Sequence, residues 1–125
     1  NDQRDGPYES YYEDGQLEYK GSFRDGKRMG PWQKFYANGQ LAEAGSYKDD
    51  LGDGLLERFR ENGQMKVKEY YREGKRDGLY ESYDENGRLK TRGNFKGGIM
   101  DGPYELYDED GQVMEAGTFK DGATH

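Results

Sequence analysis

The side chains that could carry out chemistry in this sequence are mostly carboxylates. The chain contains 26 acidic residues, no cysteine and a single histidine, His125, which is its last residue. Nucleophilic catalysis by cysteine and acid–base catalysis by histidine are therefore poorly supported. Pairs of carboxylates are the remaining acid–base candidates, but they are equally typical of a solvated charged surface. We expect a non-enzymatic protein with no catalytic residue and no cofactor.

One acidic segment resembles the start of a calcium-binding loop. The segment YDEDGQV contains Asp108, Asp110 and Gly111 at suitable spacing. An EF-hand loop needs a glutamate at its twelfth position, where Phe119 stands in this chain. A hairpin turn accounts for the same residues, so we expect no metal site here.

The elements that must position these side chains form a repeat with a period of 24 residues. Glycine recurs at this period in two columns: Gly6, Gly30, Gly54, Gly78 and Gly102, and Gly15, Gly39, Gly63, Gly87 and Gly111. No insertion or deletion interrupts either column. One domain, 1–125, therefore divides into units 6–29, 30–53, 54–77, 78–101 and 102–125.

Each unit has the sequence of a β-hairpin. Alternating and aromatic residues flank an Asp-Gly or Asn-Gly pair such as Asp14-Gly15, which favours a two-residue type I′ turn. A glycine-containing segment then leads to the next unit. Because an isolated hairpin is marginally stable, neighbouring hairpins must stack side by side. The predicted fold class is all-β: an elongated single-domain solenoid, or ribbon, of five 24-residue antiparallel β-hairpin repeats.

A two-residue turn determines which side chains share a face of the sheet. It places Tyr12 opposite Leu17 and Tyr8 opposite Gly21, and Phe23 continues this face. We expect this face to be the core, with the ring of Tyr8, and its counterparts in other units, lying over the bare backbone of the strand glycine.

The third unit departs from this pattern at two positions together. Glu69 replaces the strand glycine, and Leu56 replaces the aromatic residue predicted to lie opposite it. The pairing therefore predicts that Gly93→Val, beneath the ring of Tyr80, costs more stability than Glu69→Val.

The other face is polar except for one aromatic residue per unit. We call these residues the aromatic row: Tyr11, Phe35, Phe59, Tyr83 and Tyr107. Such a row suits an interface, since aromatic side chains bring large contact area at low entropic cost. The alternative is that the curvature of the ribbon or a terminal segment covers it. The candidate binding residues for a protein partner are this row and the neighbouring acids Glu9, Glu57, Glu81 and Glu105.

The charge of the chain restricts its partners. The formal net charge is −7, which opposes binding to nucleic acid and strong binding to anionic membranes. A partner with a basic surface would be attracted instead.

The pattern GxYExYYExGxLxxxGxFxxGKxxG over residues 6–122 resembles the MORN repeat, and it is most similar to the bacterial YwqK-type antitoxin variant. The resemblance implies a curved β-ribbon that serves as a scaffold or binding surface. Departures from the pattern at Glu69, at Asp50 and at the adjacent Leu51-Gly52 predict a deviation from regular curvature between units two and three.

The resemblance and the charge favour an antitoxin or immunity protein that neutralises a toxin or secreted effector by direct binding. The alternative is a MORN-type structural scaffold or cell-envelope organiser without a toxin partner. An aromatic module for glycan or choline-like ligands is a third candidate, but a single tryptophan in five units argues against it. Together with the opening NDQRDG, which lacks an initiator methionine, the resemblance favours a periplasmic or exported protein, with the cytoplasm as the alternative.

Overall fold

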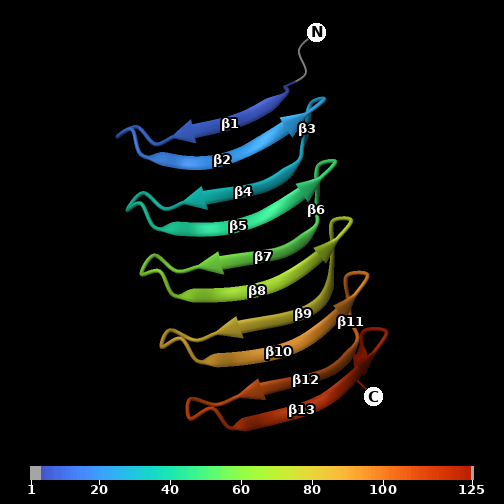
Figure 1. Ribbon diagram of the computed structural model, residues 1–125. Helices are drawn as coiled ribbons and strands as arrows, with labels where there is room; N and C mark the ends of the chain where they lie inside the picture. The colour runs from blue at the N-terminus through green and yellow to red at the C-terminus, as the bar shows by residue number, and fades with distance from the viewer. Residues whose placement is uncertain (1–3, 125) are drawn as a thin grey trace.

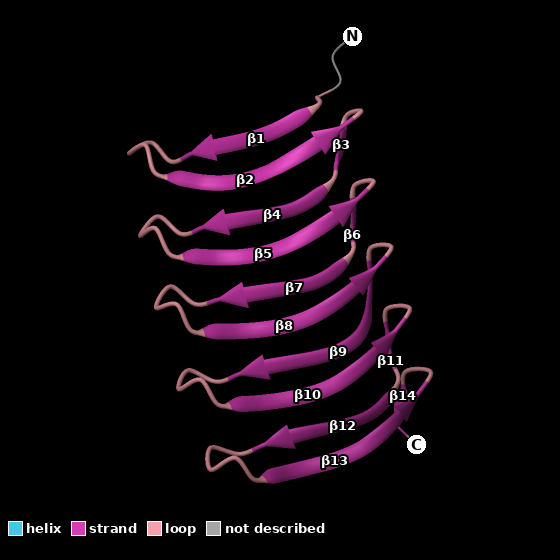
Figure 2. Ribbon diagram, in the orientation of Figure 1, coloured by secondary structure: helices cyan, strands magenta, loops and turns pink. Residues whose placement is uncertain are grey.

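The computed structural model describes residues 4–124, which form strands and turns and contain no helix (Figure 1, Figure 2). The predicted all-β class is confirmed. The strands are β1 (Gly6–Tyr11), β2 (Leu17–Arg24), β3 (Lys27–Arg28), β4 (Gly30–Phe35), β5 (Leu41–Lys48), β6 (Leu51–Gly52), β7 (Gly54–Phe59), β8 (Met65–Arg72), β9 (Lys75–Tyr83), β10 (Leu89–Lys96), β11 (Ile99–Met100), β12 (Gly102–Tyr107), β13 (Val113–Lys120) and β14 (Ala123–Thr124).

These strands form one open antiparallel sheet in a single curved layer (Figure 1). The long strands follow the chain in the order β1-β2-β4-β5-β7-β8-β9-β10-β12-β13, so each hairpin pairs with the next one. The hairpin loops lie along one long edge of the ribbon, and the connections between units lie along the other. The predicted ladder of five hairpins is confirmed.

The hairpin loops differ from the prediction. The amide of Gly15 donates to the carbonyl of Tyr12 (2.9 Å), and the amide of Tyr12 donates to the carbonyl of Gln16 (2.8 Å). The loop therefore has three residues, 13–15, and of these only Gly15 has a positive φ (90°). This is a type I turn followed by a left-handed glycine, and it recurs in all five units. The predicted two-residue turn is wrong because an Asp-Gly pair suits both kinds of loop.

Type I′ geometry occurs instead at the connections between units. Asp25 (φ 53°) and Gly26 (φ 82°) form the first of these turns, between β2 and β3. At the second, Asp50 takes the glycine position with a φ of 71°. Its Oδ1 accepts hydrogen bonds from the amide (2.8 Å) and the Nε (2.9 Å) of Arg28 in the preceding connection. β6 pairs with β5 as the corresponding short strands do in the other units, so the strand pairing at this connection is regular.

The longer loop changes the pairing near the hairpin end. Tyr8 lies opposite Gly21 and Ser10 opposite Tyr19, as predicted. Leu17, however, lies opposite Tyr11 rather than Tyr12, because a β-bulge shifts the register at this point. Because directly opposed residues share a face, Leu17 is on the face of Tyr11, and its predicted place on the core face is wrong.

Aromatic rings pack along the face that carries Tyr8, which we call the Tyr8 face. Within units, Tyr8 packs edge-on against Phe23, with 5.6 Å between ring centroids. Between units, Trp32 stacks on Tyr19 at 6.0 Å. Such pairs contribute roughly 0.5–1.5 kcal/mol beyond the area they bury. Because the sheet has a single layer, these rings are half-buried, and Ala42 is the one buried hydrophobic residue in the described part of the chain.

Two strand glycines lie beneath the opposing ring, as predicted. A Cβ on Gly45 would lie 3.0 Å from Cζ2 of Trp32, and a Cβ on Gly117 would lie 2.8 Å from Cε1 of Tyr104. In these units the absence of a side chain makes room for the ring.

The other two strand glycines have different neighbours. Gly21 is covered by Tyr19 of its own strand, whose hydroxyl would lie 2.9 Å from an added Cβ. Gly93 faces Cε of Met100 at 3.2 Å, and no atom of Tyr80 would lie within 4 Å of an added Cβ, so the predicted cover by Tyr80 is wrong. Register fixes which backbones are opposite, but the side-chain rotamers decide which ring covers the glycine.

Candidate binding surface

The aromatic row lies on the face opposite Tyr8, which we call the Tyr11 face. Its five members are the last residues of β1, β4, β7, β9 and β12, so the structure brings them together in one line across the sheet. Tyr11, at the N-terminal end of the ribbon, is 55% exposed, and the other four are half-buried. A terminal segment does not cover this row within residues 4–124, because the chain ends lie at opposite ends of the ribbon (Figure 1).

Each tyrosine of the row donates a hydrogen bond to a glutamate two residues earlier on its strand. The three pairs are Tyr11–Glu9 (2.5 Å), Tyr83–Glu81 (3.1 Å) and Tyr107–Glu105 (2.5 Å). These bonds confirm that the row and the neighbouring acids share one face. The bond to the carboxylate is the main cause of the raised pKa of Tyr11 and Tyr107, whereas burial is the main cause for Tyr83. The hydroxyls are therefore fixed as protonated donors.

Acidic and basic residues alternate across the strands on this face. Glu57, Lys68, Glu81, Arg92 and Glu105 lie opposite one another in succession across five neighbouring strands. Arg92 contacts Glu81 at 3.0 Å, and Glu81 is only 7% exposed. These residues therefore form a row of alternating charge in which Glu81 is structural.

Within residues 4–124, acidic residues without an ion pair gather at the hairpin loops. These loops were not predicted from the sequence as a candidate site. We call this side of the ribbon the acidic loop edge. The loops 12–16, 36–40, 60–64, 84–88 and 108–112 contain eight acidic residues and two basic ones: Glu13, Asp14, Glu61, Asp84, Glu85, Asp108, Glu109 and Asp110, with Arg60 and Arg88. The acidic loop edge could have been predicted from the acidic residues that cluster around the Asp-Gly and Asn-Gly pairs.

A second missed feature holds the aromatic row in place. In the first three units, the residue after the row member donates a hydrogen bond to the backbone carbonyl of the row member in the next unit. The three bonds are Tyr12 to Phe35 (2.6 Å), Tyr36 to Phe59 (2.6 Å) and Arg60 to Tyr83 (3.0 Å). The recurrence of a long donor at this repeat position was the available signal. These bonds fix the spacing of the row.

The calcium-like segment forms a hairpin loop, as predicted. Oδ1 of Asp108 accepts hydrogen bonds from the amides of Asp110 and Gln112, both at 2.9 Å, which uses the carboxylate within the turn. In the described part of the chain, no group of three or more His, Cys, Asp or Glu side chains is placed to hold a metal ion. His125 lies outside the described residues.

Residues 4–124 contain no helix that is long and apolar enough to cross a membrane.

The fold and this surface define a class of protein: an elongated repeat of β-hairpins that presents one side chain per unit at regular spacing. A family model described as the MORN repeat variant matches residues 4–25, 30–49, 52–73, 76–96 and 100–121. These five segments cover most of the chain and coincide with its five hairpins, and the protein belongs to this family. The family indicates a repeat protein that binds proteins or membranes, and it is generally non-enzymatic. No curated protein has significant sequence similarity to the chain.

Proposed function

We propose that the protein binds a protein partner on its Tyr11 face, and that it acts as an antitoxin or immunity protein that neutralises a toxin or secreted effector. The observation that carries this proposal is the aromatic row, which is in register across five units and partly exposed. Soluble proteins rarely leave such aligned aromatic side chains accessible without a binding role.

The row is organised for tight contact. Its tyrosine hydroxyls are held by glutamates, and the backbone at Phe35, Phe59 and Tyr83 is held by the preceding unit. A partner therefore meets side chains that lose little freedom on binding. Energetic hot spots concentrate at the centre of an interface, so Phe59 and Tyr83 should contribute most.

The acidic loop edge supports a partner with a basic surface. Since the acids on the Tyr11 face are largely matched by Lys68 and Arg92, long-range attraction comes mainly from the loops. A Glu85→Gln/Glu109→Gln double substitution should slow association and weaken its dependence on salt, with little effect on dissociation.

The test begins with capture from the native source by the wild-type chain and by a Phe59→Ser/Tyr83→Ser chain. Proteins retained by the first and lost from the second are candidates for the partner. Each candidate is then expressed in a host that lacks the antitoxin.

Growth arrest that is relieved by the wild-type chain, but not by the double variant, supports neutralisation through this face. A captured partner that is harmless alone would contradict the antitoxin function and favour a structural scaffold or cell-envelope organiser.

A further inference from the structure

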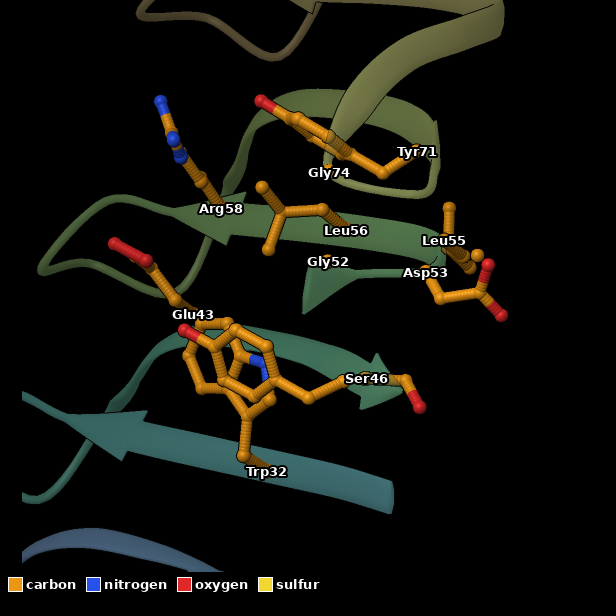
Figure 3. Close-up of a pocket in the computed structure, with 12 residues that line it drawn as sticks. Trp32, Glu43, Ser46, Gly52, Asp53, Leu55, Leu56, Arg58, Tyr71 and Gly74 are labelled. Atoms are coloured by element: carbon orange, nitrogen blue, oxygen red, sulfur yellow. The ribbon is translucent and has the colours of Figure 1, made fainter. Parts of the chain in front are cut away.

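A hollow of about 250 Å³ opens on the Tyr8 face between the second and third units (Figure 3). Trp32 forms one wall, Tyr71 forms the other, and Leu56 lies between them. Tyr47, which also lines the hollow, is stacked on Trp32. The hollow is on the opposite face from the aromatic row, so it is separate from the surface proposed above.

The hollow exists because one ring of the repeat is missing. Leu56 occupies a position that is aromatic in the other four units: Tyr8, Trp32, Tyr80 and Tyr104. In each of those units this ring packs against the ring at the end of the second strand, with centroids 4.7–5.8 Å apart. Tyr71 ends the second strand of unit three, and in the described part of the chain it has no ring partner. A ring from another molecule would fill the vacant position.

The hollow has a polar end formed by Glu43 and Arg58. These two residues lie opposite each other on β5 and β7, and both line the hollow (Figure 3). No ion pair joins them, and Nε of Arg58 is buried without a hydrogen-bond partner. Because Nε is inaccessible, an occupant would accept a hydrogen bond from a terminal nitrogen of the Arg58 guanidinium and donate one to the carboxylate of Glu43.

A phenol meets both requirements, and the molecule contains each half of the contact elsewhere. The hydroxyl of Tyr104 donates to Oε2 of Glu115 at 3.0 Å, and Glu115 is the repeat equivalent of Glu43. Nη1 of Arg28 donates to the hydroxyl of Tyr47 at 3.0 Å. Phenylalanine has no polar group, and an indole donates but does not accept.

We propose that this hollow binds the side chain of a tyrosine residue in a protein or peptide partner. The ring stacks between Trp32 and Tyr71 over Leu56, and its hydroxyl bridges Glu43 and Arg58.

The test uses the full chain and two probes, N-acetyltyrosinamide and N-acetylphenylalaninamide. Trp32 is the single tryptophan, so its indole N–H gives one signal in an NMR titration. We expect a saturable shift with the tyrosine probe and at least ~10-fold weaker binding of the phenylalanine probe, because the latter leaves Arg58 and Glu43 unpaired. Equal affinities, or no shift with either probe, would overturn the proposal.

Two variants locate the site. Leu56→Tyr places the chain's own ring in the hollow and should abolish binding of the tyrosine probe. Arg58→Met should reduce the affinity of the tyrosine probe to that of the phenylalanine probe, whereas the exposed control Arg24→Met should not. If Leu56→Tyr does not fold, Arg58→Met still decides the outcome, and retained discrimination in that variant contradicts the proposal. Phe59→Ser/Tyr83→Ser should bind the probe like wild type, so failure here is distinct from failure of the proposed function.

Discussion

Replacing Gly45 with alanine puts a methyl group against the Tyr8 face where two side chains already lie. The new Cβ would be 2.9 Å from Cδ1 of Leu56 and 3.0 Å from Cζ2 of Trp32. Gly45 does not have a positive φ, so alanine introduces no backbone strain. The destabilising part of the effect therefore comes from the displacement of Trp32 and Leu56.

The expected magnitude is the difference between two opposing effects. Overpacking of this kind typically costs about 1–3 kcal/mol. Alanine recovers roughly 0.5–1 kcal/mol relative to glycine within a strand, because it has less conformational freedom to lose. Gly45→Ala should therefore lower the free energy of unfolding by about 1 kcal/mol, and by at most about 2.5 kcal/mol.

The matched control is Gly52→Ala in β6. An added Cβ there meets Tyr71 at 3.7 Å, which is an ordinary contact, and Gly52 also lacks a positive φ. Gly52→Ala should leave stability unchanged or raise it by up to about 1 kcal/mol. Urea unfolding followed by the emission of Trp32 measures both variants and also reports on the environment of the displaced ring. Equal stability of the two variants, with unchanged emission of Trp32, would refute the proposed packing of this ring over Gly45.

Three further predictions concern contacts between and within units. Arg76→Met should lower the free energy of unfolding by about 3–5 kcal/mol, because it leaves the buried carboxylate of Glu69 unpaired. Glu69→Val should lower it by less than about 1 kcal/mol, because Arg76 is 43% exposed and remains solvated. Equal losses in urea unfolding would contradict this asymmetry. Tyr36→Phe removes the 2.6 Å bond to the next unit and should cost about 0.5–1.5 kcal/mol in the same assay, and Tyr70→Phe, which loses no such bond, should cost less. The pKa of Asp50 is lowered, mainly because its carboxylate accepts a hydrogen bond from the backbone amide of Arg28. The carboxylate therefore stabilises the fold above the ordinary pKa of 3.8, and this stabilisation is lost as the pH falls towards the lowered pKa. Asp50→Asn should flatten the dependence of stability on pH in this acidic range, and an unchanged dependence would contradict the role of this carboxylate.

The repeat allowed the ladder and the aromatic row to be predicted, because both depend on position within a period of 24 residues. The loop type could not be predicted in the same way. Asp14-Gly15 fits a two-residue and a three-residue loop, and the backbone hydrogen bonds of the loop and the pairing of Leu17 with Tyr11 distinguish them. The wrong loop type gave Leu17, and its counterpart in each unit, the wrong partner on the first strand. The predicted pairs nearer the connections, such as Tyr8 with Gly21, are confirmed.

The roles of two glutamates depended on contacts from neighbouring units. Glu81 was named as a candidate binding residue, but Lys68 and Arg92 flank it on the two adjacent strands, and it is buried. Glu69 was recognised as a substitution for glycine opposite Leu56, and that pairing is confirmed. Its 2.6 Å contact with Arg76 was not apparent, because that contact depends on the path of the connection to the next unit.

The most direct test of the account is the affinity of the captured partner for the Phe59→Ser/Tyr83→Ser chain, compared with wild type and with Tyr11→Ser at the end of the row. Circular dichroism first establishes that each chain retains its β-spectrum. The account predicts that the double variant loses at least about 100-fold in affinity, through faster dissociation, while Tyr11→Ser loses less than about tenfold. Unchanged affinity in a folded double variant would contradict binding through the Tyr11 face, and loss of the β-spectrum would show instead that the aromatic row is part of the core.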